Sequence, residues 1–182
     1  MILSGKEIQA ELGKGINIEP FKKEQLGANS YNLRLANKLL VYTNSELDMK
    51  KDNATEELTI PKGGLVLLPG RLYLGKTVEY TQTTKFAPFL EGRSSIARLG
   101  LFVHISAGFG NVGSSGCWTL ELTCVQPVKI YSDVEICQIY YQVIKGDLIQ
   151  LAKDGKFDVI VHGCNCHCTM GKGIAPQIKK AF

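Results

Sequence analysis

The 182-residue sequence lacks a long apolar run, a strong charge bias and a targeting segment. No run approaches the roughly 20 apolar residues that span a membrane, so we expect no membrane partner. The opening "MILSGKEIQAELGKG" is interrupted by Lys6 and Glu7 where a signal peptide needs an apolar core, which predicts a cytoplasmic protein. The net charge of +4 comes from scattered basic residues, so we expect no nucleic-acid partner. A hydrophobic content of 45% predicts a folded globular chain.

The sequence also lacks the paired motifs of zinc sites. No C-x2-C pair is followed by a second pair, and the H-x-E and P-C-x-x-C motifs of zinc-dependent nucleobase deaminases do not occur. Cys164, Cys166 and Cys168 alternate, and in a strand they would face one way at steps of about 7 Å. We therefore expect no metal site, and the six cysteines are interpreted as thiols of a reducing compartment.

The hydrophobic pattern predicts a mainly β domain over residues 1–143. A short helix begins at "SGKE", which has the form of a capping box. Short alternating or apolar runs follow, separated by Gly, Pro, Asn and Asp, as in a sandwich or partly closed barrel. Over residues 144–182 the pattern changes to a helix, a continuous apolar strand and a glycine loop that enters a helix. This change predicts a short α/β C-terminal fragment.

Residues with side chains suited to catalysis or phosphate binding are most concentrated in residues 91–122, "EGRSSIARLGLFVHISAGFGNVGSSGCWTLEL". Ser94 and Ser95 precede a short segment with helical spacing, and a serine is well placed to cap it. With Arg93 and Arg98 beside it, such a helix start suits phosphate oxygens. The alternative is an ordinary capped turn with two exposed arginines.

The run "WTLELTCV" predicts a strand. Alternation places Trp118, Leu120 and Leu122 on one face and Glu121 on the other. Glu121 is then either a solvated carboxylate on the outer face of an antiparallel sheet or a general base that lines a pocket.

Taken together, these pieces resemble the dCTP deaminase branch of the dUTPase-like superfamily. The matching motifs are "MILSGKEI", "IEPF", "LGANSYNLRL", "LEGRSSIARLGLFVH", "SAGFGNVG", "WTLEL" and "EICQI". The resemblance implies a dUTPase-like distorted β-barrel or jelly roll (β-clip) and a homotrimer with shared active sites. It also implies hydrolysis of dCTP to dUTP and ammonia, with Mg²⁺ carried by the triphosphate and no tightly bound cofactor.

The resemblance also assigns roles by position. Glu121 matches the general base, Ser94 and the carbonyl of Ala107 match groups that hold the attacking water, and Arg98 matches the arginine near the reacting centre. The positions matching substrate-binding groups are Arg93, Ser95 and Gln138 for the triphosphate, Thr119 and Leu120 for the strand backbone beside the nucleotide, and Asn111 in the glycine-rich loop.

Two departures from the family pattern leave alternatives open. Some relatives carry an aspartate where this chain has Asn111, and because an amide cannot act as a base this residue argues against dUTP hydrolysis. Relatives also continue after "ICQI" into a segment that folds over the nucleotide, which a different sequence replaces here from about residue 145. The alternatives are a bifunctional enzyme that forms dUMP and a catalytically weak protein that binds nucleotides or ADP-ribose.

The C-terminal stretch "KGDLIQLAKDGKFDVIVHGCNCHCTMGKGIAPQIKKAF" resembles the opening of a macro domain, an ADP-ribose-binding module. That likeness implies a contact of Asp147 with adenine, of Asn165 with the distal ribose, and of the loop between Gly171 and Gly173 with ribose and phosphates. A strand and two helices are too few to bury a core of their own. We therefore interpret this segment as a vestigial site that serves as a structural passenger.

Overall fold

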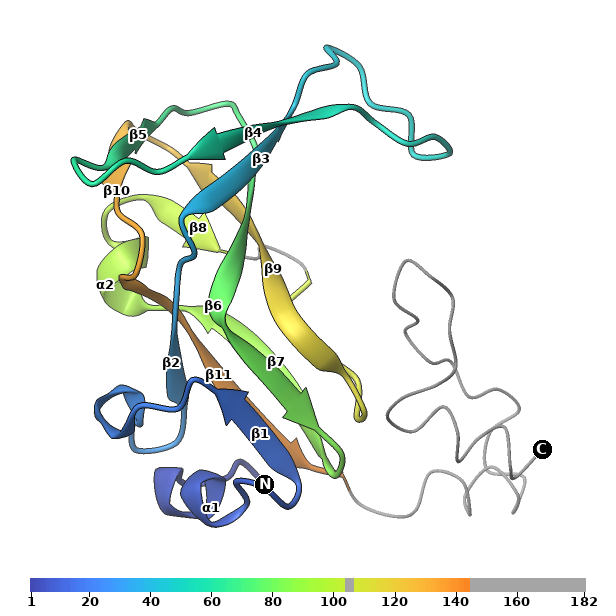
Figure 1. The fold of residues 1–182 in the computed structure, drawn as a ribbon, viewed down its shortest axis with the longest axis vertical. Helices are drawn as coiled ribbons and strands as arrows, with labels where there is room; N and C mark the ends of the chain where they lie inside the picture. The colour runs from blue at the N-terminus through green and yellow to red at the C-terminus, as the bar shows by residue number, and fades with distance from the viewer. Residues whose placement is uncertain (104–106, 145–182) are drawn as a thin grey trace.

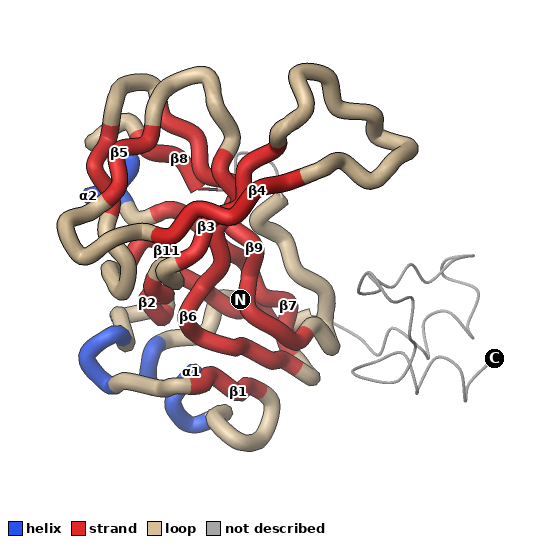
Figure 2. The backbone as a smooth tube through the Cα atoms, turned by 45° about the horizontal axis from the view of Figure 1, so that its top comes forward, coloured by secondary structure: helices blue, strands red, loops and turns tan. Residues whose placement is uncertain are grey.

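The computed structural model describes residues 1–103 and 107–144, and these form a mainly β fold (Figure 1). This confirms the fold class expected from the alternating pattern. The described helices are short: α1 (Gly5–Ala10), the 3₁₀ turn η1 (Lys23–Gln25) and α2 (Ser94–Ala97). Figure 2 shows α1 and α2 at the periphery of a body made largely of strands. The α/β fragment was expected over residues 144–182, and from residue 145 on it lies outside the described residues.

The larger sheet has six strands and carries Glu121, the predicted base, on β9. Its strands run in the order β4-β3-β6-β9-β8, and β1 also pairs with β6. The bounds are β1 (Ile16–Glu19), β3 (Lys38–Tyr42), β4 (Thr55–Thr59), β6 (Tyr73–Thr83), β8 (Leu101–Val103) and β9 (Ser115–Cys124). The long strand β6 therefore links the N-terminal strand to β9.

Two smaller sheets complete the described fold. The three-stranded sheet has the order β2-β11-β7, with β2 (Tyr31–Arg34), β7 (Phe86–Gly92) and β11 (Glu135–Val143). The two-stranded sheet pairs β5 (Leu65–Leu67) with β10 (Val128–Ile130). In Figure 1, β7 and β11 pass behind β6, so two sheets face each other across the interior.

The hydrophobic core is built by the inward-facing residues of both larger sheets. Leu33, Ile139 and Tyr141 of the three-stranded sheet are fully buried, as are Leu120 and Leu122 of β9. Alternate burial along β9 follows from the pleat of a strand, which points successive side chains to opposite faces. The inward row fixes the register of β9 and leaves its outward row for chemistry.

The capping box at the start of α1 is confirmed. The amide of Glu7 donates to Ser4 Oγ at 3.3 Å, and Glu7 Oε2 accepts from the amide of Ser4 at 2.7 Å. These hydrogen bonds to Ser4 hold the pKa of Glu7 below its usual range, because they stabilise the ionised carboxylate. The box anchors the chain just before it enters β1.

Two strands, β7 and β8, were not expected from the sequence. Strand β7 contains Pro88, which cannot donate to a ladder and therefore weakens the strand pattern of "FAPFLEG". The proline is tolerated because β7 is the end strand of its sheet, and on its other side it meets only an isolated bridge, Phe89 to Phe109, in which Pro88 accepts through its carbonyl. Strand β8 has three residues and is defined by its pairing with β9 rather than by a pattern of its own.

No helix among the described residues is long and apolar enough to cross a membrane.

Candidate active site

The "GRSS" motif lies at the turn from β7 into α2. Arg93 has extended backbone angles (φ −75°, ψ 139°) and occupies the N-cap position, and its carbonyl accepts from the amides of Ile96 and Ala97. No side chain makes a capping hydrogen bond to α2, so the predicted serine cap is wrong. The helix begins at Ser94, so both serines lie in its first turn and do not precede it as expected. Both serines are exposed and available to a ligand.

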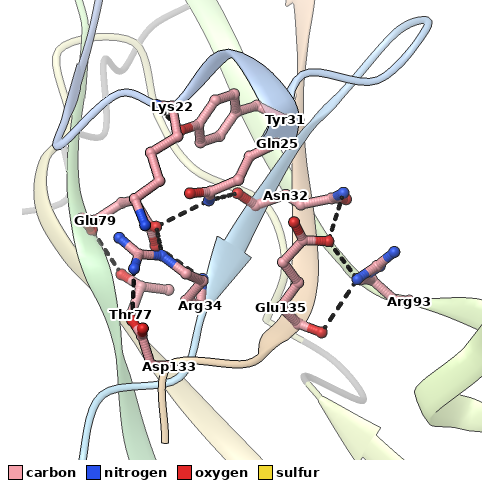
Figure 3. Close-up of polar contacts among 10 residues, drawn as sticks. All are labelled: Lys22, Gln25, Tyr31, Asn32, Arg34, Thr77, Glu79, Arg93, Asp133 and Glu135. Carbon is pink, nitrogen blue, oxygen red and sulfur yellow. Dashed lines mark hydrogen bonds and ion pairs between the residues drawn. The ribbon is translucent and has the colours of Figure 1, made fainter.

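Arg93 is held by a carboxylate from β11. Its Nη1 donates to Glu135 Oε2 at 2.5 Å and to the Glu135 carbonyl at 3.4 Å (Figure 3). Glu135 Oε2 also accepts from Asn32 Nδ2 at 3.0 Å. The shared carboxylate therefore links β2, β11 and the start of α2, and it orients the guanidinium predicted to bind phosphate.

Gln138 lies on the same sheet, and β-pairing places it between Glu91 of β7 and Asn32 of β2. Its Oε1 accepts from Ser30 Oγ at 3.2 Å. Two residues before Gln138 on the same strand, the Ile136 carbonyl accepts from the Arg93 amide at 3.3 Å.

Glu121, the predicted base, lies on β9 of the six-stranded sheet. Its side chain is on the half-buried row of the strand, opposite Leu74 of β6, while its neighbours Leu120 and Leu122 point into the core. Leu120 therefore offers only its backbone to a ligand, and Thr119 is exposed. A carboxylate beside an apolar neighbour on a partly covered face suits a general base better than a fully solvated glutamate does.

Ala107 and Asn111 lie on a segment that comes after β8 in the chain and runs antiparallel beside β7, with a bridge between Phe89 and Phe109. The amide of Leu90 donates to the Gly108 carbonyl at 2.7 Å, and the amide of Gly110 donates to the Pro88 carbonyl at 2.8 Å. The approach is so close that a Cβ at Gly108 would lie 2.3 Å from the Leu90 carbonyl oxygen. Glycine is therefore required for this segment to lie against β7. Ala107 and Asn111 are both exposed.

The predicted site residues thus fall into three groups. Arg93, Ser94, Ser95, Arg98 and Gln138 gather around the β7–α2 turn and β11 of the three-stranded sheet. Thr119, Leu120 and Glu121 lie on the six-stranded sheet, and Ala107 and Asn111 lie between them in sequence. Glu135 therefore ties Arg93 to β11, while the predicted base belongs to another sheet.

A buried charged cluster beside these groups was missed from the sequence. Glu79 of β6 is completely buried, and its carboxylate accepts from the Arg34 amide at 2.8 Å, from Arg34 Nε at 2.7 Å and from Gln25 Nε2 at 2.9 Å. Arg34 also pairs with Asp133. The available signal was in β6, where Glu79 occupies an inward position between Thr77 and Thr81. Arg34 gave no such signal, because it directly follows the inward Leu33 and its burial breaks the alternation of β2.

The environment of Arg34 keeps it charged. Burial disfavours the guanidinium cation, but the hydrogen bond to Glu79 and the charges of Glu79 and Asp133 outweigh burial and raise the pKa of Arg34. Losing either partner of this pair would leave an uncompensated buried charge.

Within residues 1–103 and 107–144, no group of three or more His, Cys, Asp or Glu side chains is arranged to hold a metal ion. The ADP-ribose contacts predicted for Asp147, Asn165, Gly171 and Gly173 lie outside the described residues.

Comparisons with known proteins agree with the fold and the motifs. A family model described as dCTP deaminase-like matches residues 2–144. The chain is 63% identical over 147 residues to the "dCTP deaminase, dUMP-forming" of Hathewaya histolytica, covering 81% of this chain and 86% of that protein. It is 62% identical over 147 residues to the protein of the same name from Clostridium acetobutylicum, covering 81% of this chain and 85% of that protein.

A solved structure of 2'-deoxycytidine 5'-triphosphate deaminase from Agrobacterium tumefaciens superposes with a TM-score of 0.63 at 20% identity. The superposition covers 84% of this chain and 52% of that one, so the chain spans about half the length of that structure. At this identity the likeness establishes the fold alone, which is consistent with the dUTPase-like β fold expected from the sequence. The chain belongs to the dCTP deaminase-like family, as the family model and the close relatives show. They give no support to a macro-domain fragment, since the family match ends at residue 144.

Proposed function

We propose that the chain hydrolyses the 4-amino group of dCTP and carries the product on to dUMP. The observation that carries this proposal is the 63% identity to a relative named dUMP-forming dCTP deaminase, over the part of the chain that holds the candidate site. The dUMP named for this relative favours the bifunctional enzyme, which was the alternative in the sequence analysis, over an enzyme that stops at dUTP. The placement of Glu121 and of the serines at α2 supports the same chemistry.

In the deamination step, Glu121 takes a proton from a water molecule that attacks C4 of cytosine. That proton passes to ring N3 as the water oxygen bonds to C4, and the remaining hydroxyl proton of the tetrahedral intermediate then passes to the 4-amino group. The C4–N bond breaks, ammonia leaves, and the 4-oxo group of uracil remains. Ser94 Oγ and the Ala107 carbonyl would orient the water, and Arg98 would stabilise charge near the reacting centre. The reaction consumes one water molecule and needs no oxidant or reductant.

The triphosphate is assigned to the region around Arg93. Glu135 engages one nitrogen of that guanidinium, which leaves the remaining edge to meet phosphate oxygens. Ser95 adds an exposed hydroxyl from the first turn of α2, and Gln138 adds an amide. Mg²⁺ enters as part of the nucleotide substrate, because Mg²⁺ is usually bound through substrate phosphates with few protein ligands.

We further propose that each active site combines residues of two subunits in a homotrimer. The base-bearing strand β9 and the phosphate-binding turn belong to different sheets of one chain. Apolar side chains lie exposed on the outward face that carries Glu121, including Leu40 at 39% and Phe102 at 40%. A neighbouring subunit that covers this face would bring its own Arg93 and Ser94 to Glu121.

A second candidate product is dUTP, and Asn111 favours it. A carboxylate can accept a proton from water, whereas the Asn111 amide can only orient it by hydrogen bonding. If the second hydrolysis needs a base at this position, the chain releases dUTP.

The deciding experiment incubates the protein with dCTP and Mg²⁺ and quantifies ammonia, dUTP, dUMP and pyrophosphate over time. We expect ammonia and dUMP in equal amounts with little free dUTP. Ammonia with accumulating dUTP would support the second candidate. Absence of ammonia at enzyme concentrations comparable to substrate, from protein shown to be folded, would overturn both.

A further inference from the structure

Strand β6 has a bulge opposite Trp118 of β9, the strand that carries Glu121. Lys76 pairs with Thr119 and Tyr80 pairs with Cys117, so three residues of β6 lie opposite the single residue Trp118. A bulge of this kind interrupts the ladder and leaves backbone groups to be satisfied in another way. The interruption lies one residue before Thr119 and three before Glu121.

The hydroxyl of Thr77 bridges this interruption. It accepts from the backbone amide of Trp118 at 2.9 Å and donates to the Glu79 carbonyl at 2.8 Å. Thr77 is 1% exposed, so both hydrogen bonds are shielded from water. One side-chain oxygen thus joins β9 to the bulge in place of regular ladder bonds.

The bulge is tied in turn to the phosphate-binding region. Glu79 accepts from Gln25, and Gln25 Nε2 also donates to the Asn32 carbonyl at 2.7 Å. Asn32 donates to Glu135, which holds Arg93. Figure 3 shows this network from Arg93 to Thr77, and the bond from Trp118 extends it to β9.

We propose that Thr77 is a positioning residue for deamination. Its hydroxyl sets the backbone of β9 at Trp118 and thereby the placement of Glu121. Because catalytic geometry is sensitive to shifts on the order of 1 Å, a loosened β9 would slow the chemical step more than it weakens substrate binding. This inference rests on the proposed dCTP deaminase activity.

The matched substitutions are Thr77→Val, which keeps the shape and removes the hydroxyl, and Thr77→Ser, which keeps the hydroxyl. For Thr77→Val we expect kcat for ammonia release to fall by roughly tenfold or more, with KM for dCTP changed by no more than about twofold. For Thr77→Ser we expect kcat within about twofold of the unmodified protein. The measurement is steady-state ammonia release at several dCTP concentrations, normalised to folded protein.

Thr81→Val provides a control on the same tryptophan. Thr81 Oγ1 accepts from the indole Nε1 of Trp118 at 2.8 Å, so its loss removes a hydrogen bond to the side chain of Trp118 but not to its backbone. We expect Thr81→Val to lower the melting temperature while kcat stays within about twofold, because the β9 backbone is still held. Thermal unfolding of every variant gives its melting temperature, so that activity is measured at a temperature at which the variant is folded.

Several outcomes would overturn the inference. A Thr77→Val protein that melts earlier but retains kcat would show a merely structural role, and equal losses in Thr77→Ser would show that the hydroxyl is not responsible. If Thr77→Val does not fold, Thr77→Cys, whose thiol is a weaker acceptor, must show a reduced kcat. An unmodified protein that releases no ammonia would overturn the proposed function and this role together, whereas normal kcat in Thr77→Val overturns this role alone.

Discussion

Among single residues, Glu121 has the clearest chemical consequence. Glu121→Gln keeps the size of the side chain and removes its ability to take a proton from water. We expect ammonia release to fall by about 10² to 10⁴-fold, the usual contribution of general base catalysis, while dCTP binding is retained. Calorimetric titration with dCTP beside the ammonia assay checks both halves, and a Glu121→Gln protein with normal turnover would remove Glu121 from its role.

Asn111 controls a different property, the identity of the product. It lies exposed in a turn in which the Ser114 amide donates to the Asn111 carbonyl, so its side chain can change without loss of core packing. Asn111→Asp introduces a carboxylate that can act on water, and we expect the hydrolysis of dUTP to become faster. The measurement supplies dUTP directly and follows the rate of pyrophosphate release. An unchanged rate would show that residue 111 does not limit the second hydrolysis.

At the scale of elements, the segment at residues 107–111 depends on its contact with β7. A Cβ at Gly108 would meet the Leu90 carbonyl oxygen, a backbone atom that cannot rotate away. We expect Gly108→Ala to push the segment off β7, to displace the Ala107 carbonyl and to reduce ammonia release by tenfold or more, on the order expected for a misplaced catalytic group. Steady-state turnover and thermal unfolding are the measurements.

Gly63→Ala is the matched control for this prediction. A Cβ at Gly63 has no neighbour within 4 Å, so the same chemical change meets open space there. We expect Gly63→Ala to leave both turnover and melting temperature near those of the unmodified protein. Equal behaviour of the two variants would show that the close approach at Gly108 carries no catalytic consequence.

Elements also show where sequence reasoning succeeds and fails. The alternation in "WTLELTCV" correctly predicted the burial of Leu120 and Leu122, because one face of the strand packs against the core, while Trp118 on the same face is only partly buried. The partner of Arg93 was not predictable, because Glu135 lies 42 residues away and reaches it only through sheet pairing. The bulge at Thr77 could not be predicted for the same reason. Three residues of β6 lie opposite one residue of β9, and this mismatch can be recognised only when the pairing of the two strands is known.

At the scale of the whole molecule, the separation of the site residues on two sheets leads to a prediction about assembly. Glu121→Gln and Ser94→Ala each impair one half of a composite site. If sites are shared between subunits, unfolding and refolding the two variants together in equal amounts regenerates about one quarter of the sites with both native residues, by random assortment of subunits. We expect ammonia release to return to about that fraction of the unmodified value.

Refolding each variant alone is the control, and neither should regain activity. A mixture that stays as inactive as its parts, despite forming mixed oligomers by size and mass, would place each active site within a single chain. The family assignment would be unaffected by that result, because it rests on sequence similarity over residues 2–144.

The place of Trp118 has a practical consequence. It is the single tryptophan of the chain, its amide bonds to the β6 bulge, and its indole is held by Thr81 two positions beyond that bulge. Excitation of tryptophan therefore yields emission from one known point on the base-bearing strand β9. The protein carries its own fluorescent reporter, with which nucleotide titrations and unfolding can be followed without an attached label.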